Sequence, residues 1–116
     1  MSVVNVKVNC IRPKYNNLEE WMADPNNVYI GRKGVVFING QRYPKHDSIW
    51  HNPFKINQTN SREDVLQKYE LYIRSKLDDN MLNMLLDLEG KNLGCWCAPE
   101  PCHGHILVKL IDEYKL

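Results

Sequence analysis

The sequence KNLGCWCAPEPCHGHILVKLI, from Lys91 to Ile111, decides the fold of this 116-residue chain. Its first part, Lys91 to Cys97, predicts a strand. Pro101 lies where the first turn of a helix accepts a residue that lacks an amide hydrogen, and an apolar stripe follows it. The stripe consists of Ile106, Leu107, Leu110, Ile111 and Tyr114. The segment therefore predicts a strand that passes directly into a C-terminal helix.

Two further helices are expected before this strand. Ser61 can cap a helix because Asp64, three residues later, completes a variant of the capping box. The apolar stripe of that helix consists of Val65, Tyr69, Tyr72, Ile73 and Leu77. A second helical stretch, residues 81–88, ends before Gly90, where glycine suits the left-handed conformation after a helix. Strand and helix thus alternate in the second half, which predicts parallel strand pairing through a crossover.

The first half of the chain has shorter elements. They are a strand (2–10), a short helix (18–23), a second strand (28–32) and a hairpin (35–38 and 41–43). The first strand is indicated by apolar residues at every second position, and the hairpin by the Asn39-Gly40 pair, which favours a tight turn. Residues 44–60 lack periodicity and predict a long structured loop, a kind of segment that often has a function.

Together these elements predict an α/β fold, a small Rossmann-like sandwich with a mostly parallel sheet, an added hairpin and a C-terminal helix. The length fits one hydrophobic core and is too short for two, so residues 1–116 are expected to form a single α/β domain. Hydrophobic residues make up 43% of the chain and charged residues 25%, which are the proportions of a globular protein rather than a disordered one.

The charge and hydropathy of the chain narrow the classes of partner. A formal net charge of +1 provides no broad basic surface, so nucleic acid is less expected as a partner than a small molecule. No apolar run approaches the length of a membrane span, and the first five residues lack the pattern of a secretory signal. We therefore expect no membrane partner and a cytoplasmic location. Three of the four cysteines lie within residues 95–102, a spacing that favours free thiols over a disulfide framework.

The cysteine and histidine cluster after the last strand is the chemical centre of the sequence. Cys95 and Cys97 would point to the same face of an extended strand, and the next connection returns Cys102 and His103 to the strand end. One interpretation is a zinc site, because three thiolates and one imidazole suit a closed tetrahedral centre. Its ligands would be Cys95, Cys97, Cys102 and either His103 or His105. The protein would then be a non-catalytic binding or interaction module stabilised by zinc, although the C-x-C spacing is unusual for zinc ligands.

A second interpretation gives the cluster a reactive thiol. Cys102 is expected in the first turn of the last helix, where free amides and the helix dipole favour a thiolate and also bind phosphate. Cys102 would then be a catalytic nucleophile or an anion contact, with His103 as the acid and base. A third interpretation is that the cysteines only pack as small buried hydrophobic residues. The residues alone leave all three interpretations open.

Three residues outside the cluster are candidates for holding a ligand. Arg32 follows a strand and lies between glycines, as an anion-binding loop requires. Asn52 can present its amide to a base or sugar while Trp50 and Phe54 form an apolar wall. Arg62 lies in the first turn of a helix, where a cation opposes the dipole, so an anion is expected nearby. The leading hypothesis is thus a protein that binds, or an enzyme that acts on, a phosphorylated, nucleotide-like ligand.

The motifs resemble those of the domain of unknown function 4326 family, whose members end in a pattern like L-x-C-x-C-x-P-x-x-C-H-[GA]-D. The matching residues are Leu93, Cys95, Cys97, Pro99, Cys102, His103 and Gly104. Upstream, the segments 29–32 and 52–54 also match. The chain departs from the pattern at His51, where the family has glycine, and at His105, where it has aspartate. The resemblance implies a compact Rossmann-like fold and no particular activity.

Overall fold

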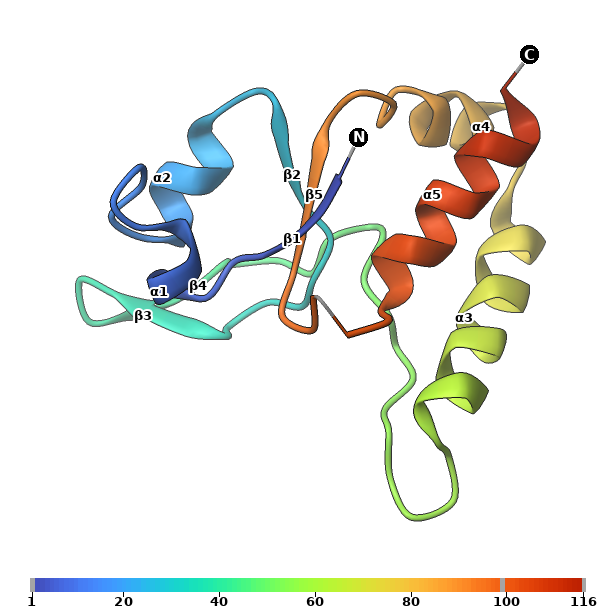
Figure 1. Cartoon of the computed structure of the whole chain (residues 1–116), viewed down its shortest axis with the longest axis horizontal. Helices are drawn as coiled ribbons and strands as arrows, with labels where there is room; N and C mark the ends of the chain where they lie inside the picture. Colours follow the sequence, from blue (N-terminus) through green and yellow to red (C-terminus); the bar gives the residue numbers. More distant parts are fainter. Residues whose placement is uncertain (1, 99, 116) are drawn as a thin grey trace.

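A three-stranded parallel sheet lies at the centre of the computed structural model, which describes residues 2–98 and 100–115 (Figure 1). The strand order is β1-β5-β2, so β5 pairs with a neighbour on each side. The strands are β1 (Ser2–Asn5), β2 (Asn27–Tyr29), β3 (Val36–Ile38), β4 (Gln41–Tyr43) and β5 (Asn92–Cys95), and the helices are α1 (Val8–Ile11), α2 (Leu18–Ala23), α3 (Arg62–Lys76), α4 (Asp79–Leu86) and α5 (His103–Tyr114). This confirms an α/β fold with a parallel sheet, a hairpin and a C-terminal helix, while the finer Rossmann-like description stays a prediction.

The central strand β5 is buried on both faces. Leu93 and Cys95 belong to the core that β5 shares with α3 and α5. Gly94 points the other way, toward Trp21 and Val6, which belong to the core under α2. Figure 1 accordingly shows α3, α4 and α5 on one side of the sheet and α1 and α2 on the other. Since Cys95 is the last residue of β5, its side chain faces the start of α5.

Helix α5 approaches the sheet closely at its first turn. A β-carbon at Gly104 would lie 2.8 Å from a methyl carbon of Val3 and 2.9 Å from the terminal carbon of Ile30. Only glycine allows the helix backbone to come this near to the strands. The N-terminus of α5 is thereby held at the carboxyl edge of the sheet, where the ends of β2 and β5 meet. None of the helices within the described residues is both long and apolar enough to span a membrane.

The local signals for turns and caps are confirmed. Asn39 and Gly40 have φ angles of 53° and 79° and connect β3 to β4. Ser61 and Asp64 form the expected capping box at the start of α3. Gly90 has the expected left-handed conformation, with a φ angle of 84°, but α4 ends earlier than predicted, at Leu86 with Asp87 as its C-cap. Each of these features is fixed by neighbouring residues alone, which is why the sequence predicts them.

The first predicted strand is wrong beyond Asn5. The Asn5 side-chain oxygen accepts a hydrogen bond of 2.9 Å from the backbone N–H of Lys7, and this turn ends the strand. The chain then enters α1, so Cys10 lies on an exposed helical turn rather than in the sheet. Pro101 also lies outside α5, which begins at His103 with Cys102 as its N-cap.

Candidate functional site

A cavity of about 370 Å³ opens at the carboxyl edge of the sheet. Its wall combines the segment after β2, the long loop after the hairpin, the end of β5 and the first residue of α5. The polar lining residues are Arg32, Asn52, Lys55, Cys97 and His103, and the others are Gly31, Val35, Phe54, Ile56, Val65 and Trp96. This His103 cavity lies where open α/β sheets bind ligands, beyond the carboxyl ends of parallel strands.

Arg32 holds the long loop against the end of β2. Its Nε and one terminal nitrogen donate hydrogen bonds of 3.0 and 2.6 Å to the carbonyl of Asn52, and the same nitrogen donates to the carbonyl of Phe54 at 3.1 Å. The Asn52 side-chain oxygen in turn accepts from the N–H of Phe54 at 2.9 Å. A planar guanidinium fits two neighbouring carbonyls in this way, so Arg32 shapes the cavity wall as well as giving it a positive charge.

Trp96 is fixed in the wall by a short chain of hydrogen bonds. Its indole N–H donates to the Tyr29 hydroxyl at 2.9 Å, and that hydroxyl donates to the Arg32 carbonyl at 2.8 Å. Burial is the main reason that the pKa of Tyr29 is raised, so the hydroxyl stays protonated and can donate. Trp96 and Phe54 therefore offer aromatic surface to the cavity from two different segments of the chain.

His103 is a neutral imidazole at the junction of sheet, loop and helix. Its Nε2 lies 2.6 Å from the carbonyl of Ile30, and its ring packs edge-on against Tyr69 with centroids 5.0 Å apart. Burial lowers the pKa of His103 to about 4. At neutral pH the ring is uncharged, and since a carbonyl can only accept, Nε2 carries the hydrogen and Nδ1 is the acceptor.

This low pKa predicts that acid destabilises the fold through His103. Between pH 6.5 and 4 the unfolded chain binds more protons at this residue than the folded chain, so stability is complete above pH 6.5 and falls as pH decreases. At pH 5 the loss is about 2 kcal/mol relative to pH 7.5. Urea unfolding at the two pH values measures it. His103→Gln keeps an N–H donor but does not titrate, so its free energy of unfolding should fall about 2 kcal/mol less between pH 7.5 and pH 5 than that of the natural chain. His46→Gln, on an exposed loop, should show the same fall as the natural chain. An equal difference in all three proteins would contradict the assignment.

Cys95 and Cys102 form a buried pair, called here the thiol pair. Their sulfur atoms are 3.2 Å apart, and the two residues are 1% and 2% exposed. The Cys102 thiol donates to Cys95, and this hydrogen bond, helped by the N–H groups of Cys97 and Ala98, lowers the pKa of Cys95 to about 6. The same hydrogen bond raises the pKa of Cys102. The two sulfurs therefore share a proton through this hydrogen bond and titrate as one unit.

Of the five residues that were expected to bind zinc, Cys95 and Cys102 come together as a pair, while Cys97 and His103 line the cavity. Within residues 2–98 and 100–115, no three histidine, cysteine or acidic side chains gather to hold a metal ion. Because β5 ends at Cys95 and the chain turns, Cys97 lines the cavity instead of joining the thiol pair. His103 bonds to the sheet, and Nδ1 of His105 accepts from the N–H of Cys102 at 3.1 Å. The described geometry thus gives the zinc interpretation no ligand set.

Only two of the three residues that were predicted to bind a ligand line the cavity. Arg32 and Asn52 reach the cavity together with His103, as expected from the sequence. Arg62 does not line it, because its guanidinium donates to the carbonyl of Pro101 at 2.9 Å and braces the start of α5. Cys102 is also absent from the lining, and Cys97 is the thiol that faces the cavity. Lys55 lines the cavity but was missed, and its place beside Asn52-Pro53-Phe54 is the sequence signal that indicates it.

His105 has a structural role at the start of α5. It occupies the third position of α5 and completes a capping box with Cys102, a position where aspartate binds the same N–H with a favourable charge. We expect His105→Asp to raise the free energy of unfolding by about 1 kcal/mol. Thermal and urea unfolding measure the change. The same substitution at His46, outside any helix, should have no stabilising effect, and a destabilised His105→Asp protein would refute the capping role.

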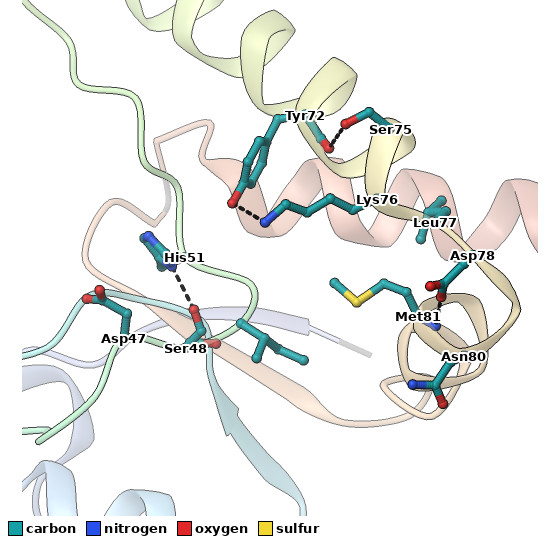
Figure 2. A pocket seen from close by; sticks show the side chains of 11 residues that line it. Asp47, Ser48, His51, Tyr72, Ser75, Lys76, Leu77, Asp78, Asn80 and Met81 are labelled. Carbon is teal, nitrogen blue, oxygen red and sulfur yellow. Dashed lines mark hydrogen bonds between the residues drawn. The ribbon is translucent and has the colours of Figure 1, made fainter.

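A larger hollow of about 750 Å³ lies between the long loop and the α3–α4 junction (Figure 2). Several of its polar side chains are already paired with one another or with nearby backbone. Lys76 bonds to the Tyr72 hydroxyl, Asp78 caps the N–H of Met81, and Nδ1 of His51 lies 2.7 Å from the carbonyl of Ser48. The His103 cavity is therefore the stronger candidate site, since it combines strand ends, aromatic surface and cationic side chains.

Comparisons with known proteins give a family and no activity. Residues 14–113 match the family described as Domain of unknown function (DUF4326). The chain is 37% identical over 99 residues to the uncharacterised protein R718 of Acanthamoeba polyphaga mimivirus, which covers 76% of this chain and 71% of the relative. It is 31% identical over 68 residues to an uncharacterised 12.4 kDa protein of the nrdA-td intergenic region of Enterobacteria phage T4, covering 57% of this chain and 62% of that protein. No solved structure is a significant match.

Proposed function

The chain belongs to the DUF4326 family, and we propose that it is a small-molecule-binding protein whose ligand is phosphorylated and nucleotide-like. The observation that carries the proposal is the convergence of Arg32, Asn52 and His103 with two aromatic side chains on one cavity at the carboxyl edge of the sheet. Its volume of about 370 Å³ lies within the usual range for small-molecule sites.

The cavity wall suggests how such a ligand lies. The planar base packs against Phe54 and Trp96, whose rings line the cavity from two segments. The phosphate lies toward the guanidinium of Arg32 and the ammonium of Lys55 at the cavity rim. His103 accepts a hydrogen bond from the ligand through Nδ1, because Nε2 is engaged by the Ile30 carbonyl.

The geometry favours ligand binding over catalysis as the function of the cavity. The expected nucleophile, Cys102, is 2% exposed and bonds to Cys95, so a ligand in the cavity touches Cys97 instead. Cys102 contributes indirectly, because it caps the helix whose first residue is His103. The N–H of His105 donates to the Cys102 carbonyl at 3.0 Å and is not offered to a phosphate. The cationic side chains therefore take the role that helix amides have in many phosphate sites.

Fluorescence titration with the four common nucleoside monophosphates tests the proposal. We expect at least one to quench Trp96, and its nucleoside to bind about tenfold more weakly because it lacks the phosphate. Lys55→Gln should weaken binding of the monophosphate by about tenfold and leave that of the nucleoside unchanged. Lys68→Gln, at an exposed position on α3 away from the cavity, is the matched control and should bind like the natural chain. Failure of all four monophosphates to bind would overturn the proposal.

A further inference from the structure

We propose that Cys95 and Cys102 are a redox modification site, at which a peroxide converts the two thiols into a reversible disulfide. The proposal does not depend on the ligand of the His103 cavity. It stands first on the geometry of the thiol pair, whose sulfur atoms lie 3.2 Å apart and face each other across the junction of β5 and α5. A disulfide bond is about 2.0 Å long, so the sulfurs need to approach by only about 1.2 Å.

The surroundings of the pair favour a thiolate. The backbone amides of Cys97 and Ala98 lower the pKa of Cys95, and those of Gly104 and His105 oppose the rise in the pKa of Cys102. The hydrogen bond from the Cys102 thiol also favours a thiolate at Cys95, because it lowers the pKa of that cysteine. A thiolate is the form of cysteine that attacks peroxides.

The reaction balances with hydrogen peroxide as the only co-reactant. The Cys95 thiolate attacks one peroxide oxygen, the O–O bond breaks, and the departing hydroxide takes the proton of Cys102 to become water. Cys95 is now a sulfenic acid. The Cys102 sulfur attacks the Cys95 sulfur, the S–S bond forms, the S–O bond breaks, and the second hydroxide is protonated by solvent. The two cysteines lose two electrons in total, and the peroxide is reduced to two water molecules.

Because the thiol pair is buried, only a small oxidant can reach it, and its reactivity differs from that of Cys10 and Cys97. With exposures of 1% and 2%, Cys95 and Cys102 are closed to bulky thiol reagents while the protein stays folded. Hydrogen peroxide is small enough to enter through modest local opening. Cys10 is exposed and Cys97 is partly buried, so these two thiols are expected to react first with a bulky reagent.

The test uses the full chain with Cys10→Ser and Cys97→Ser, so that the thiol pair contains the only cysteines left. The protein is treated with a chelator before use. After hydrogen peroxide and denaturing alkylation, intact-mass spectrometry should show a chain that has lost two hydrogens and takes up no alkyl group. Dithiothreitol should restore two alkylation sites. Because the fold holds the sulfurs together, the disulfide should form at least about tenfold faster in the folded protein than in concentrated urea.

Three results in the double variant would overturn the proposal. They are a disulfide that forms no faster in the folded protein than in urea, two thiols that remain alkylatable after peroxide, and oxygen added to a sulfur without a disulfide. The natural chain provides a second measurement that keeps all packing intact. There, peroxide should remove two of the four thiols and leave Cys10 and Cys97 alkylatable. Loss of any other pair would also contradict the assignment.

Discussion

Replacing Gly94 with alanine is expected to destabilise the protein by about 3 kcal/mol. The added β-carbon would lie 2.4 Å from the Trp21 ring and 2.7 Å from a methyl carbon of Val6. Both neighbours are buried, at 3% and 1% exposure, so neither can move into solvent. Since Gly94 pairs with Val4 and Tyr29 in the central strand, β5 cannot shift without breaking the sheet. The melting temperature should fall by on the order of 10 °C, measured by circular dichroism.

A double-mutant cycle identifies the clash as the cause. Trp21→Phe removes the ring atoms that the new methyl group would meet, at the cost of a cavity in the natural chain. In the Gly94→Ala protein, Trp21→Phe should lower the free energy of unfolding by less than it does in the natural chain. The coupling energy between the two substitutions should be at least about 1 kcal/mol. Strictly additive costs would show that Gly94 is needed for some other reason than the close packing of Trp21 on β5.

Replacing Arg32 with lysine is expected to cost about 2 to 3 kcal/mol of stability and at least tenfold in affinity for a nucleoside monophosphate. The positive charge is kept, but an ammonium cannot bridge the carbonyls of Asn52 and Phe54 as the guanidinium does. The loop that provides Lys55 and Ile56 to the cavity would then loosen. Urea unfolding gives the stability, and hydrogen exchange of the Phe54 N–H reports the loop directly.

Arg42→Lys is the matched control for this change. Arg42 also donates to a backbone carbonyl, that of Gly34 at 3.0 Å, but it lies on the exposed hairpin and makes one such bond. We expect its stability to change by less than about 0.5 kcal/mol and its ligand affinity to stay the same. If the two variants behave alike, Arg32 has no special role in shaping the cavity.

The sequence predicted features that neighbouring residues determine. The turn at Asn39-Gly40 and the capping box of Ser61 and Asp64 need only a few adjacent side chains, so their signals are local. The strand end at Asn5 was missed because the asparagine side chain replaces the next sheet hydrogen bond with a turn. Period-two spacing continues to Cys10 in the sequence although the strand does not, because spacing alone does not show where pairing stops.

The candidate site was located from the sequence more accurately than its parts were assigned. Arg32, Asn52, Arg62, Cys102 and His103 were expected together, and the fold brings only Arg32, Asn52 and His103 to one cavity. The roles of Cys97 and Cys102 could not be separated, because their separation depends on β5 ending at Cys95. The course of the loop that carries Lys55 depends on bonds from Arg32 to Asn52, 20 residues later, so its neighbourhood in the sequence did not show that Lys55 faces the cavity.

The most direct test of the account is a ¹⁵N–¹H spectrum of the protein titrated with the nucleoside monophosphate that binds best. We predict shifts confined to Arg32, the backbone N–H groups of residues 52 and 54–56, the Trp96 indole N–H and residues 97 and 103. Shifts centred on the hollow around Tyr72, Lys76 and Met81, or no shifts with any of the four monophosphates, would contradict the claim that the His103 cavity is the functional site.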